Sequence, residues 1–329
     1  MKAIINTKYG PPDVLELKEV EKPAPKEDEV LVEVHAASVN AYDWHLLTAD
    51  IFLIRLMGGG LLKPKITRPG ADVAGRVEAV GRNVQQFRPG DEVFGDIAGS
   101  GNGSFGEYAC ARENALALKP TNLSFEEAAA VPMAAVTALQ GLRNQGHIQP
   151  GQKVLINGAS GGVGTFAVQI AKSFGAEVTA VCSTRNVDQA RSIGADHVID
   201  YTQEDITKNG QQYNLILAVN GYHPISAYKR ALAPKGIYVM AGGTPAQIFQ
   251  AMLLGPLMSI TGGKKMGGVS AKQSQKDLVY MKELIEAGKV KPVIDKCYLL
   301  SEAAEALRYL GEGHARGKVV ITVEHNNKT

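Results

Sequence analysis

The feature that most constrains the fold is a glycine-rich turn between an apolar run at 153–157 and a helix-like run at 165–172. A strand that enters a helix through glycines directs backbone N–H groups and the positive end of the helix at a pyrophosphate. The sequence therefore predicts a dinucleotide-binding βαβ unit, although a plain strand–turn–helix unit would look similar. The turn residues predicted to contact the dinucleotide are Ala159, Ser160, Gly161, Gly162, Val163 and Gly164.

The rest of the second half repeats this alternation of strand and helix. Apolar runs typical of strands occupy 153–157, 177–182, 197–200, 215–219 and 236–240, with helix-like segments between them. Such alternation is typical of a parallel sheet with helices on its faces. The pattern predicts an α/β domain with a doubly wound parallel sheet.

The first 121 residues have a different pattern. Short β-rich runs at 30–35, 73–80 and 107–111 are separated by Pro and Gly, which predicts a mostly β domain. Ser124, with Glu127 three residues later, predicts the start of an Ala-rich helix that runs to about Asn144. Near the C-terminus, Ser301 is predicted to cap a helix toward Leu310, and a closing strand is expected at 318–323.

We therefore expect two domains, one at 1–122 that is completed by 289–329 and one at 123–288. The net charge is +2 and no basic block occurs, so nucleic acid is not expected as a partner. The sequence has neither a signal-peptide core nor an apolar run of about 18 residues, so we expect a cytoplasmic protein without stable membrane insertion. Three widely separated cysteines, Cys110, Cys182 and Cys297, fit reduced thiols.

The residues after the second strand of the βαβ unit bear on the cofactor. An NAD enzyme places an acid there to bind the ribose 2′-OH. The sequence has Ser183, Thr184 and Arg185 instead, which could bond a 2′-phosphate, and the nearest acid in the sequence, Asp188, is expected to face away on the next helix. NADPH is therefore the predicted cofactor, unless Arg185 is an ordinary surface charge.

Several blocks in the same order resemble the quinone oxidoreductase branch of the medium-chain dehydrogenase/reductase superfamily, especially chloroplast-envelope quinone oxidoreductase-like proteins and bacterial enone reductases. The resemblance covers nearly the whole chain and implies a GroES-like mostly β catalytic domain, a Rossmann cofactor domain, a cleft between the two, and a homodimer formed near Ser259 to Thr261. The blocks that carry it are 40–44, 69–75, 103–108, 129–140, 159–164, 194–201 and 314–320.

This resemblance also implies further cofactor contacts. The Tyr201 side chain would point toward the 2′-phosphate, and Arg316 and Lys318 would help to bind the cofactor. The nicotinamide half would lie along Thr137, Asn220, Gly242 and Gly243, although Thr137 could equally serve helix capping or packing.

The resemblance further implies that no zinc is bound. Zinc-dependent relatives carry a Cys in the segment that matches 39–43 and a Gly-His-Glu in the segment that matches 70–72, where this chain has Asn40 and Ala71-Asp72. Catalytic zinc needs about three protein ligands, and the thiolate and imidazole are both missing here. A zinc alcohol dehydrogenase is therefore the weaker alternative.

Without a Lewis acid, acceptors that spread charge are favoured. We expect reduction of quinones or of the C=C bond of α,β-unsaturated carbonyls, with hydrogen-bond donors stabilising the developing charge. The catalytic candidates are Asn40, Tyr42 and Asp43, although Asp43 and Trp44 could instead cap a helix or act as a wedge between domains.

Other readings stay open. The apolar segment 51–57, followed by Gly58 to Gly60, could be a lid over an apolar substrate or an ordinary packing helix. His45 is expected to be an exposed helical residue. The chain could also bind NADPH without turnover, as a redox sensor or scaffold.

Overall fold

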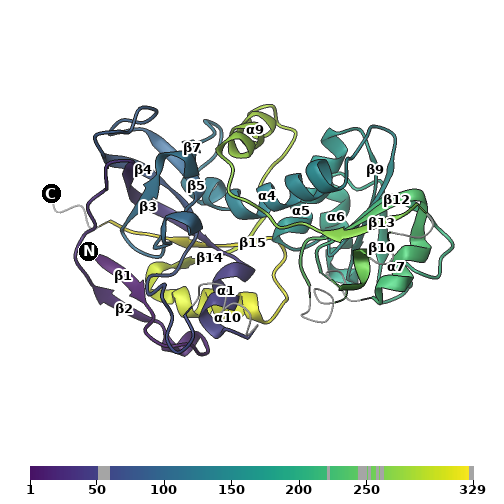
Figure 1. Cartoon of the computed structure of the whole chain (residues 1–329), viewed down its shortest axis with the longest axis horizontal. Helices are drawn as coiled ribbons and strands as arrows, with labels where there is room; N and C mark the ends of the chain where they lie inside the picture. The colour runs from purple at the N-terminus through teal and green to yellow at the C-terminus, as the bar shows by residue number, and fades with distance from the viewer. Residues whose placement is uncertain are drawn as a thin grey trace. The chain divides into compact units, whose positions relative to one another are not determined.

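The computed structural model describes residues 1–50, 60–220, 223–243, 250, 253–256, 259 and 263–325. Its contacts divide the chain into two compact units (Figure 1). Unit 1 comprises residues 1–133, 273–286 and 292–329, and unit 2 comprises residues 134–272 and 287–291. The predicted lid segment lies outside the described residues except for Gly60, and of the predicted dimer strand only Ser259 is described.

Unit 1 is mostly β, as the spacing of its short apolar runs predicts. Its larger sheet has the order β14-β15-β3-β4-β5-β7, with β6 also paired to β3, and β1 and β2 form a separate antiparallel pair. The strands are β1 (Lys2–Ile5), β2 (Glu16–Glu19), β3 (Glu29–Val39), β4 (Asp72–Val80), β5 (Glu92–Asp96), β6 (Tyr108–Arg112), β7 (Leu116–Leu118), β14 (Ile294–Leu299) and β15 (Lys318–Thr322).

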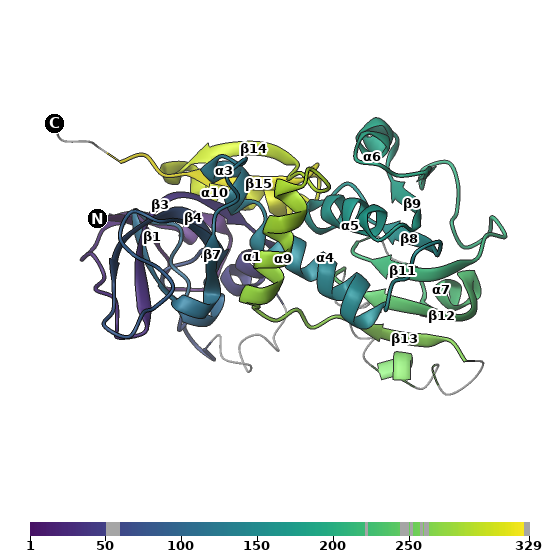
Figure 2. The same ribbon diagram turned by 90° about the horizontal axis from the view of Figure 1, so that it is seen from above.

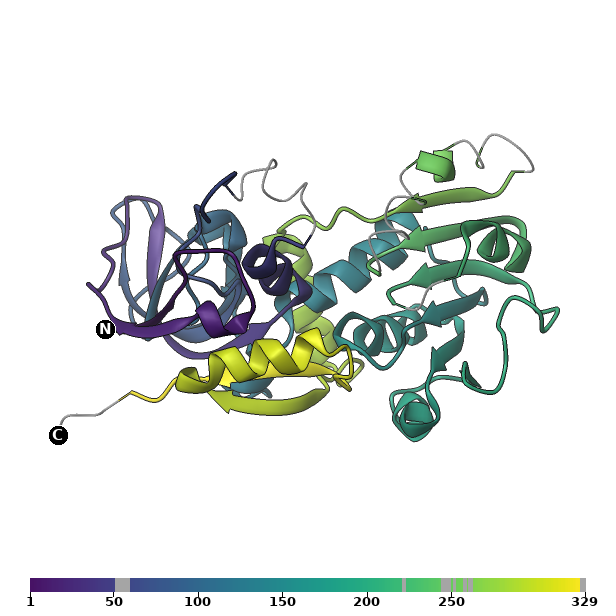
Figure 3. The same ribbon diagram turned by 90° about the horizontal axis from the view of Figure 1, so that it is seen from below.

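Helices cover this sheet at several points. The helices of unit 1 are α1 (Ala41–Thr48), α3 (Phe125–Ala129), α9 (Gln275–Glu286) and α10 (Ala303–Gly311). The yellow helix α10 lies beside β14, β15 and α1 (Figure 3). The apolar face of α10 buries Ala303, Ala306 and Leu307 in the same core as the valines of β3, so this C-terminal helix belongs to the β-rich unit.

Unit 2 has the predicted doubly wound parallel sheet. Its six strands have the order β10-β9-β8-β11-β12-β13, all parallel, with α5 packed on β8 and β9 and α6 on β9 and β10 (Figure 2). The elements are β8 (Lys153–Asn157), α5 (Gly162–Ser173), β9 (Glu177–Cys182), α6 (Val187–Ser192), β10 (His197–Asp200), β11 (Tyr213–Ala218), α7 (Ile225–Ala231), β12 (Leu232–Met240) and β13 (Lys265–Gly268). Carboxyl ends of parallel strands meet at one edge, so the segments after β8, β9, β10, β11 and β12 share that edge.

The structure corrects two helix predictions. The Ala-rich helix is divided into α3, α4 (Pro132–Leu139) and a π-helical segment at Gln140–Gln145, because Pro132 has no N–H group and biases the preceding residue away from the helical region. Ser124 and Glu127 do form the predicted capping box. Ser301 is not a cap: it lies inside the 3-10 turn Leu300–Glu302, where Glu302 accepts from the Leu299 N–H at 2.8 Å.

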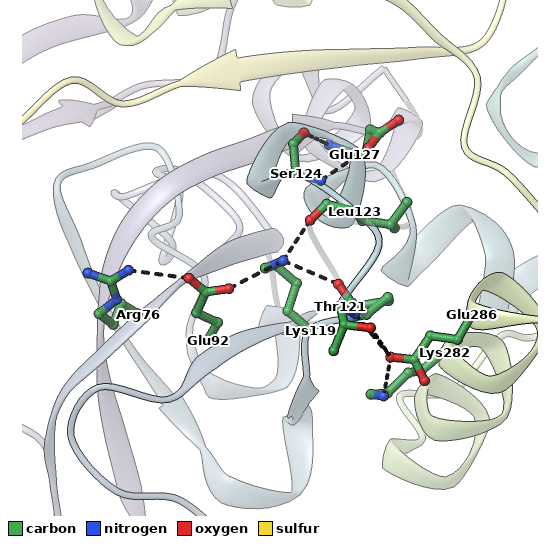
Figure 4. A network of polar contacts seen from close by, with 10 residues as sticks. Arg76, Glu92, Lys119, Thr121, Leu123, Ser124, Glu127, Lys282 and Glu286 are labelled. Atoms are coloured by element: carbon green, nitrogen blue, oxygen red, sulfur yellow. Dashed lines mark hydrogen bonds and ion pairs between the residues drawn. The ribbon is translucent and has the colours of Figure 1, made fainter.

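The unit boundaries also differ from the predicted ones, because polar contacts hold α3 and α9 on unit 1. Lys119 donates to the Leu123 carbonyl at 2.6 Å, just before α3, and pairs with Glu92 at 3.3 Å (Figure 4). On the other side Thr121 donates its N–H to Glu286 of α9 at 3.0 Å. These contacts place 123–133 and 273–286 in unit 1.

Candidate functional site

The glycine turn of unit 2 opens a long helix that has no side-chain cap. Gly161 is the N-cap of α5 and its backbone is extended, with φ −82° and ψ 178°. A Cβ at Gly161 would meet only the Gly158 carbonyl oxygen, at 3.9 Å, so the face of this residue is open. Uncapped N–H groups beside an open backbone form a site into which a phosphate group fits.

Two other glycines of the turn are needed for packing. A Cβ at Gly164 would lie 2.1 Å from the Gly158 carbonyl oxygen, so only glycine lets the helix approach the strand this closely. Gly158 itself has φ +86°, and a Cβ there would lie 2.7 Å from the Asn220 nitrogen. Gly158 is not among the predicted turn residues, because its role depends on Asn220, which lies far along the sequence.

The remaining predicted turn residues divide into two kinds. Ala159 is buried and donates its N–H to the Val181 carbonyl at 3.0 Å, so its backbone serves the sheet. Ser160, Gly162 and Val163 are partly exposed at the start of α5. The open part of the turn therefore runs from Ser160 to Val163.

Three residues predicted for the nicotinamide half follow the neighbouring strands. Asn220 comes after β11, and its N–H donates to the Asn157 carbonyl at 3.2 Å, beside the glycine turn. Gly242 and Gly243 come after β12; a Cβ at Gly242 would lie 2.7 Å from the Val219 carbonyl oxygen, and Gly243 has φ +122°. These residues therefore line up along one sheet edge. Thr137 lies on α4 with 9% exposure.

The adenosine end is predicted at the turn after β9. Thr184 and Arg185 are exposed there and Ser183 is partly exposed. Asn186 is buried and donates from its side-chain nitrogen to the Ser183 hydroxyl at 3.2 Å. The turn therefore presents one cation and two hydroxyls, groups suited to a phosphate.

An acid from another strand lies beside this turn. Asp200 ends β10 directly opposite Cys182, and its carboxylate accepts from the Thr184 hydroxyl at 2.5 Å. Asp188, the nearest acid in the sequence, lies on α6 and pairs with Arg191 at 3.7 Å. Tyr201 follows Asp200 and is 59% exposed. The segment after β9 has no acid of its own, as the sequence indicates, but the neighbouring strand supplies one.

Unit 1 contains a buried polar cluster at the end of β3. Asp72 on β4 is fully buried and accepts from the Ser38 hydroxyl at 2.8 Å and the Asn40 side-chain nitrogen at 2.9 Å. Its other oxygen accepts from the Met133 N–H at 3.0 Å, near the start of α4. Lys318 on β15 lies 3.6 Å from Asp72 and donates to the Asn40 side-chain oxygen. Burial raises the pKa of Asp72 and lowers that of Lys318, while their mutual attraction opposes both shifts.

This cluster engages the whole Asn40 amide. Its nitrogen donates to Asp72 and, at 3.4 Å, to the Ser38 carbonyl, and its oxygen accepts from Lys318. Asn40 was predicted to donate a hydrogen bond during catalysis and Lys318 to hold the cofactor. In the structure both side chains are buried and bonded to unit 1, so a contact with a ligand would require these bonds to be shared or broken.

Asp43 caps the helix that follows the cluster. It is 1% exposed and accepts from the Asn40 N–H at 2.9 Å, while its second oxygen has no hydrogen-bond partner among the described residues. Burial raises the pKa of Asp43 to about 7, and the nearby Asp72 carboxylate acts in the same direction. The capping alternative is therefore seen for Asp43, and its predicted catalytic role stays a prediction.

Tyr42 is the half-buried candidate. Its hydroxyl lies 3.5 Å from the Asn102 side-chain oxygen and 3.4 Å from the Asn102 side-chain nitrogen, long distances that indicate a weak contact. Burial raises the pKa of Tyr42, although the contact with Asn102 lowers it. The hydroxyl is therefore protonated at neutral pH and can donate.

The other predicted residues of unit 1 have structural contacts. Trp44 packs on Gly311 of α10, where a Cβ would lie 2.2 Å from the indole ring. His45 lies on α1 and its ring nitrogen Nδ1 is 2.8 Å from Asp50. Arg316 donates its backbone N–H to Asp295 at 2.8 Å, and its cofactor role stays a prediction.

Two further findings hold for the described residues. No group of His, Cys, Asp or Glu is placed to hold a metal, and no helix is long and apolar enough to cross a membrane.

Two family profiles match the chain. Residues 26–121 match the alcohol dehydrogenase GroES-like domain, and residues 193–321 match a family described as zinc-binding dehydrogenase. Together with the β-rich unit 1 and the parallel sheet of unit 2, these matches define a two-domain dehydrogenase or reductase. The GroES-like and Rossmann fold predictions are confirmed.

Individual relatives narrow this class. The chain is 34% identical over 322 residues to the chloroplast envelope quinone oxidoreductase homolog of Arabidopsis thaliana, covering 93% of each chain. It is 34% identical to the NADPH-dependent alkenal/one oxidoreductase of Arabidopsis thaliana, over 98% of this chain and 79% of the relative. The solved quinone oxidoreductase from Coxiella burnetii has a TM-score of 0.87 and 30% identity, over 98% of this chain and 99% of that one.

The chain belongs to the quinone oxidoreductase and enone reductase branch of the medium-chain dehydrogenase/reductase superfamily. It is therefore an oxidoreductase that uses a nicotinamide cofactor and acts on small molecules. The resemblance seen in the sequence is confirmed.

The open face at Gly161 gives a first prediction. Gly161→Ala adds a methyl group that the protein can accommodate, so we expect the free energy of unfolding to change by less than about 1 kcal/mol. The same methyl group would occupy the space needed by a phosphate, so the Kd for the nicotinamide cofactor should rise at least about tenfold. Isothermal titration calorimetry and urea unfolding measure the two effects. Unchanged cofactor affinity in a folded variant would contradict the assignment.

Asp43 gives a second prediction. Its folded pKa of about 7 exceeds the ordinary value, so folding favours the protonated form, and its contribution to stability is lost as pH rises from about 4 to about 7. The free energy of unfolding of Asp43→Asn, relative to that of the wild type, should therefore increase by ~2 kcal/mol as the pH rises from 5 to 8. Urea unfolding followed by the fluorescence of Trp44, the only tryptophan, measures this difference. The exposed Asp28→Asn is the control, and an equal pH trend in both variants would disprove the prediction.

Proposed function

We propose that this enzyme uses NADPH to reduce quinones or the C=C bond of α,β-unsaturated carbonyls without a zinc ion. The observation that carries the proposal is the shared sheet edge of unit 2. There the open N-terminus of α5 lies at the end of β8, and Ser183, Thr184 and Arg185 follow β9. The first group fits a pyrophosphate, and the second fits a 2′-phosphate.

In this proposal each group of residues binds one part of the cofactor. The turn from Ser160 to Val163 binds the pyrophosphate, Arg185 with Ser183 binds the 2′-phosphate, and Asn220, Gly242 and Gly243 line the nicotinamide half. Tyr201, which is exposed after β10, covers the adenosine end. The family resemblance also assigns Arg316 and Lys318 to the cofactor, and for Lys318 this contact requires its buried bonds with Asn40 and Asp72 to be shared or broken. When bound, the reduced nicotinamide supplies a hydride.

On the acceptor side, Tyr42 is a better donor than Asn40. The Asn40 amide is fully engaged by Asp72, Ser38 and Lys318, whereas among the described residues the Tyr42 hydroxyl has only the long contact with Asn102. A hydroxyl that stays protonated can donate to a carbonyl oxygen as negative charge develops on it. Enones and quinones delocalise that charge, so one such donor supports their reduction without a metal. In this proposal Asn40 positions α1, on which Tyr42 lies.

A turnover assay tests the function. NADPH oxidation is followed at 340 nm with a panel of quinones, 2-alkenals and 2-cyclohexenone, before and after treatment with a zinc chelator. We expect turnover with at least one of these acceptors and no loss of activity after chelation. Cofactor binding without turnover of any acceptor would instead support the sensor, and activity that depends on one bound zinc would support the alcohol dehydrogenase.

The cofactor preference is tested separately at Arg185. Arg185→Ala should raise the KM for NADPH at least about tenfold, because a charge-assisted bond to phosphate is lost, and should change the KM for NADH less than twofold. Arg191→Ala removes the same charge from the exposed face of α6 and is the matched control. If both variants respond alike, the effect is only one of surface charge, and the assignment of Arg185 is wrong.

A further inference from the structure

The two hydroxyls after β9 have opposite hydrogen-bonding roles. The Ser183 hydroxyl accepts a hydrogen bond from the buried Asn186 side chain at 3.2 Å, so its own proton remains to be donated to a ligand. The Thr184 hydroxyl instead donates its proton to Asp200 at 2.5 Å. A hydroxyl has one proton, so Thr184 can offer a ligand only its lone pairs.

Asp200 is held in place to accept that proton. Its other oxygen accepts from the Thr202 N–H at 2.9 Å and from the Thr202 hydroxyl at 2.8 Å. The hydrogen bond from Thr184 is the main cause that lowers the pKa of Asp200, so the carboxylate is ionised at neutral pH. A negative charge therefore lies one hydrogen bond away from the residue that the proposed function places beside the 2′-phosphate.

We propose that Asp200 is a specificity-determining residue that weakens binding of the 2′-phosphate by repelling it and by keeping the Thr184 proton. This inference rests on the proposed function, since it assigns the turn after β9 to the 2′ position of the adenosine ribose. Arg185 and Ser183 favour the phosphate, and Asp200 with Thr184 oppose it. The balance gives an enzyme that prefers NADPH but also binds NADH, whose 2′-OH can donate to the lone pairs of Thr184.

The Asp200→Asn variant reverses both effects with little change of shape. The Thr202 N–H and hydroxyl keep the amide oxygen on their side, so the new NH₂ group faces Thr184 and donates to its hydroxyl, while the Thr184 N–H, which also bonds this carboxylate, loses its acceptor. The Thr184 hydroxyl proton is then available to a phosphate, and the negative charge is removed. Asp188→Asn is the matched control, because it removes the same charge from a fully exposed carboxylate on α6 that pairs with Arg191.

The test measures Kd by isothermal titration calorimetry for NADP⁺ and NAD⁺ with the full-length chain. In Asp200→Asn we expect the Kd for NADP⁺ to fall about five- to tenfold and the Kd for NAD⁺ to stay the same or rise. In Asp188→Asn both should change less than twofold. In a Thr184→Val background the gain from Asp200→Asn should be smaller, because the hydroxyl that transmits part of it is absent.

Two results would overturn the inference. If Asp200→Asn changes both Kd values by the same factor, Asp200 only anchors the turn, and if Asp188→Asn gives the same gain for NADP⁺, the effect is one of general charge. Urea unfolding of each variant separates loss of fold from loss of binding. Failure of the proposed function is a different result, in which the wild type binds NAD⁺ more tightly than NADP⁺ and Arg185→Ala has no effect. The change that Asp200→Asn makes in the ratio of the two Kd values would still report on Asp200.

Discussion

The buried pair of Lys318 and Asp72 is the contact on which the geometry of unit 1 depends. It joins the last strand, β15, to β4, and both partners bond to Asn40 at the end of β3. Charges in a protein interior are tolerated only when they are paired and hydrogen-bonded, and removal of one partner typically costs about 3–5 kcal/mol. The cluster therefore fixes the point at which β3 ends and α1 begins, and with it the place of Tyr42 two residues later.

Much of the fold was predictable because it depends on local periodicity. Strands β8, β9 and β10 have the predicted bounds, since buried parallel strands are short apolar runs closed by Gly or polar residues. The unit boundaries were not predictable in the same way. Gln275 of α9 donates to the Leu116 carbonyl at 2.8 Å, and Asn122 donates to the Ile285 carbonyl at 3.0 Å. Contacts of a side chain with a distant backbone leave no periodic pattern in the sequence.

In the candidate site, too, local features were predictable from the sequence and long-range contacts were not. The glycine turn was predictable from residues that are adjacent in the chain, but Gly158 was missed because its role depends on Asn220, far along the sequence. Asp200 could not be found from the residues that follow β9, because strand pairing is what brings the end of β10 beside them. Asn40 was predicted as a donor from the chemistry of its side chain alone, and its hydrogen bonds with Asp72 and Lys318 could not be foreseen from the sequence. Sequence patterns indicate which groups are available, and the register of the strands decides which of them are already engaged.

The order of strands in unit 1 has a consequence for how the chain is made. Strand β15 lies between β14 and β3, yet it follows every other described strand in the chain and is therefore synthesised after them, whereas unit 2 is almost continuous in sequence. The parallel sheet can assemble while synthesis continues, but the part of β3 at 36–39 stays without its neighbour until β15 emerges, whereas β6 pairs earlier with 29–33. An open strand edge can pair with other chains, so nascent molecules are most exposed to aggregation during that interval.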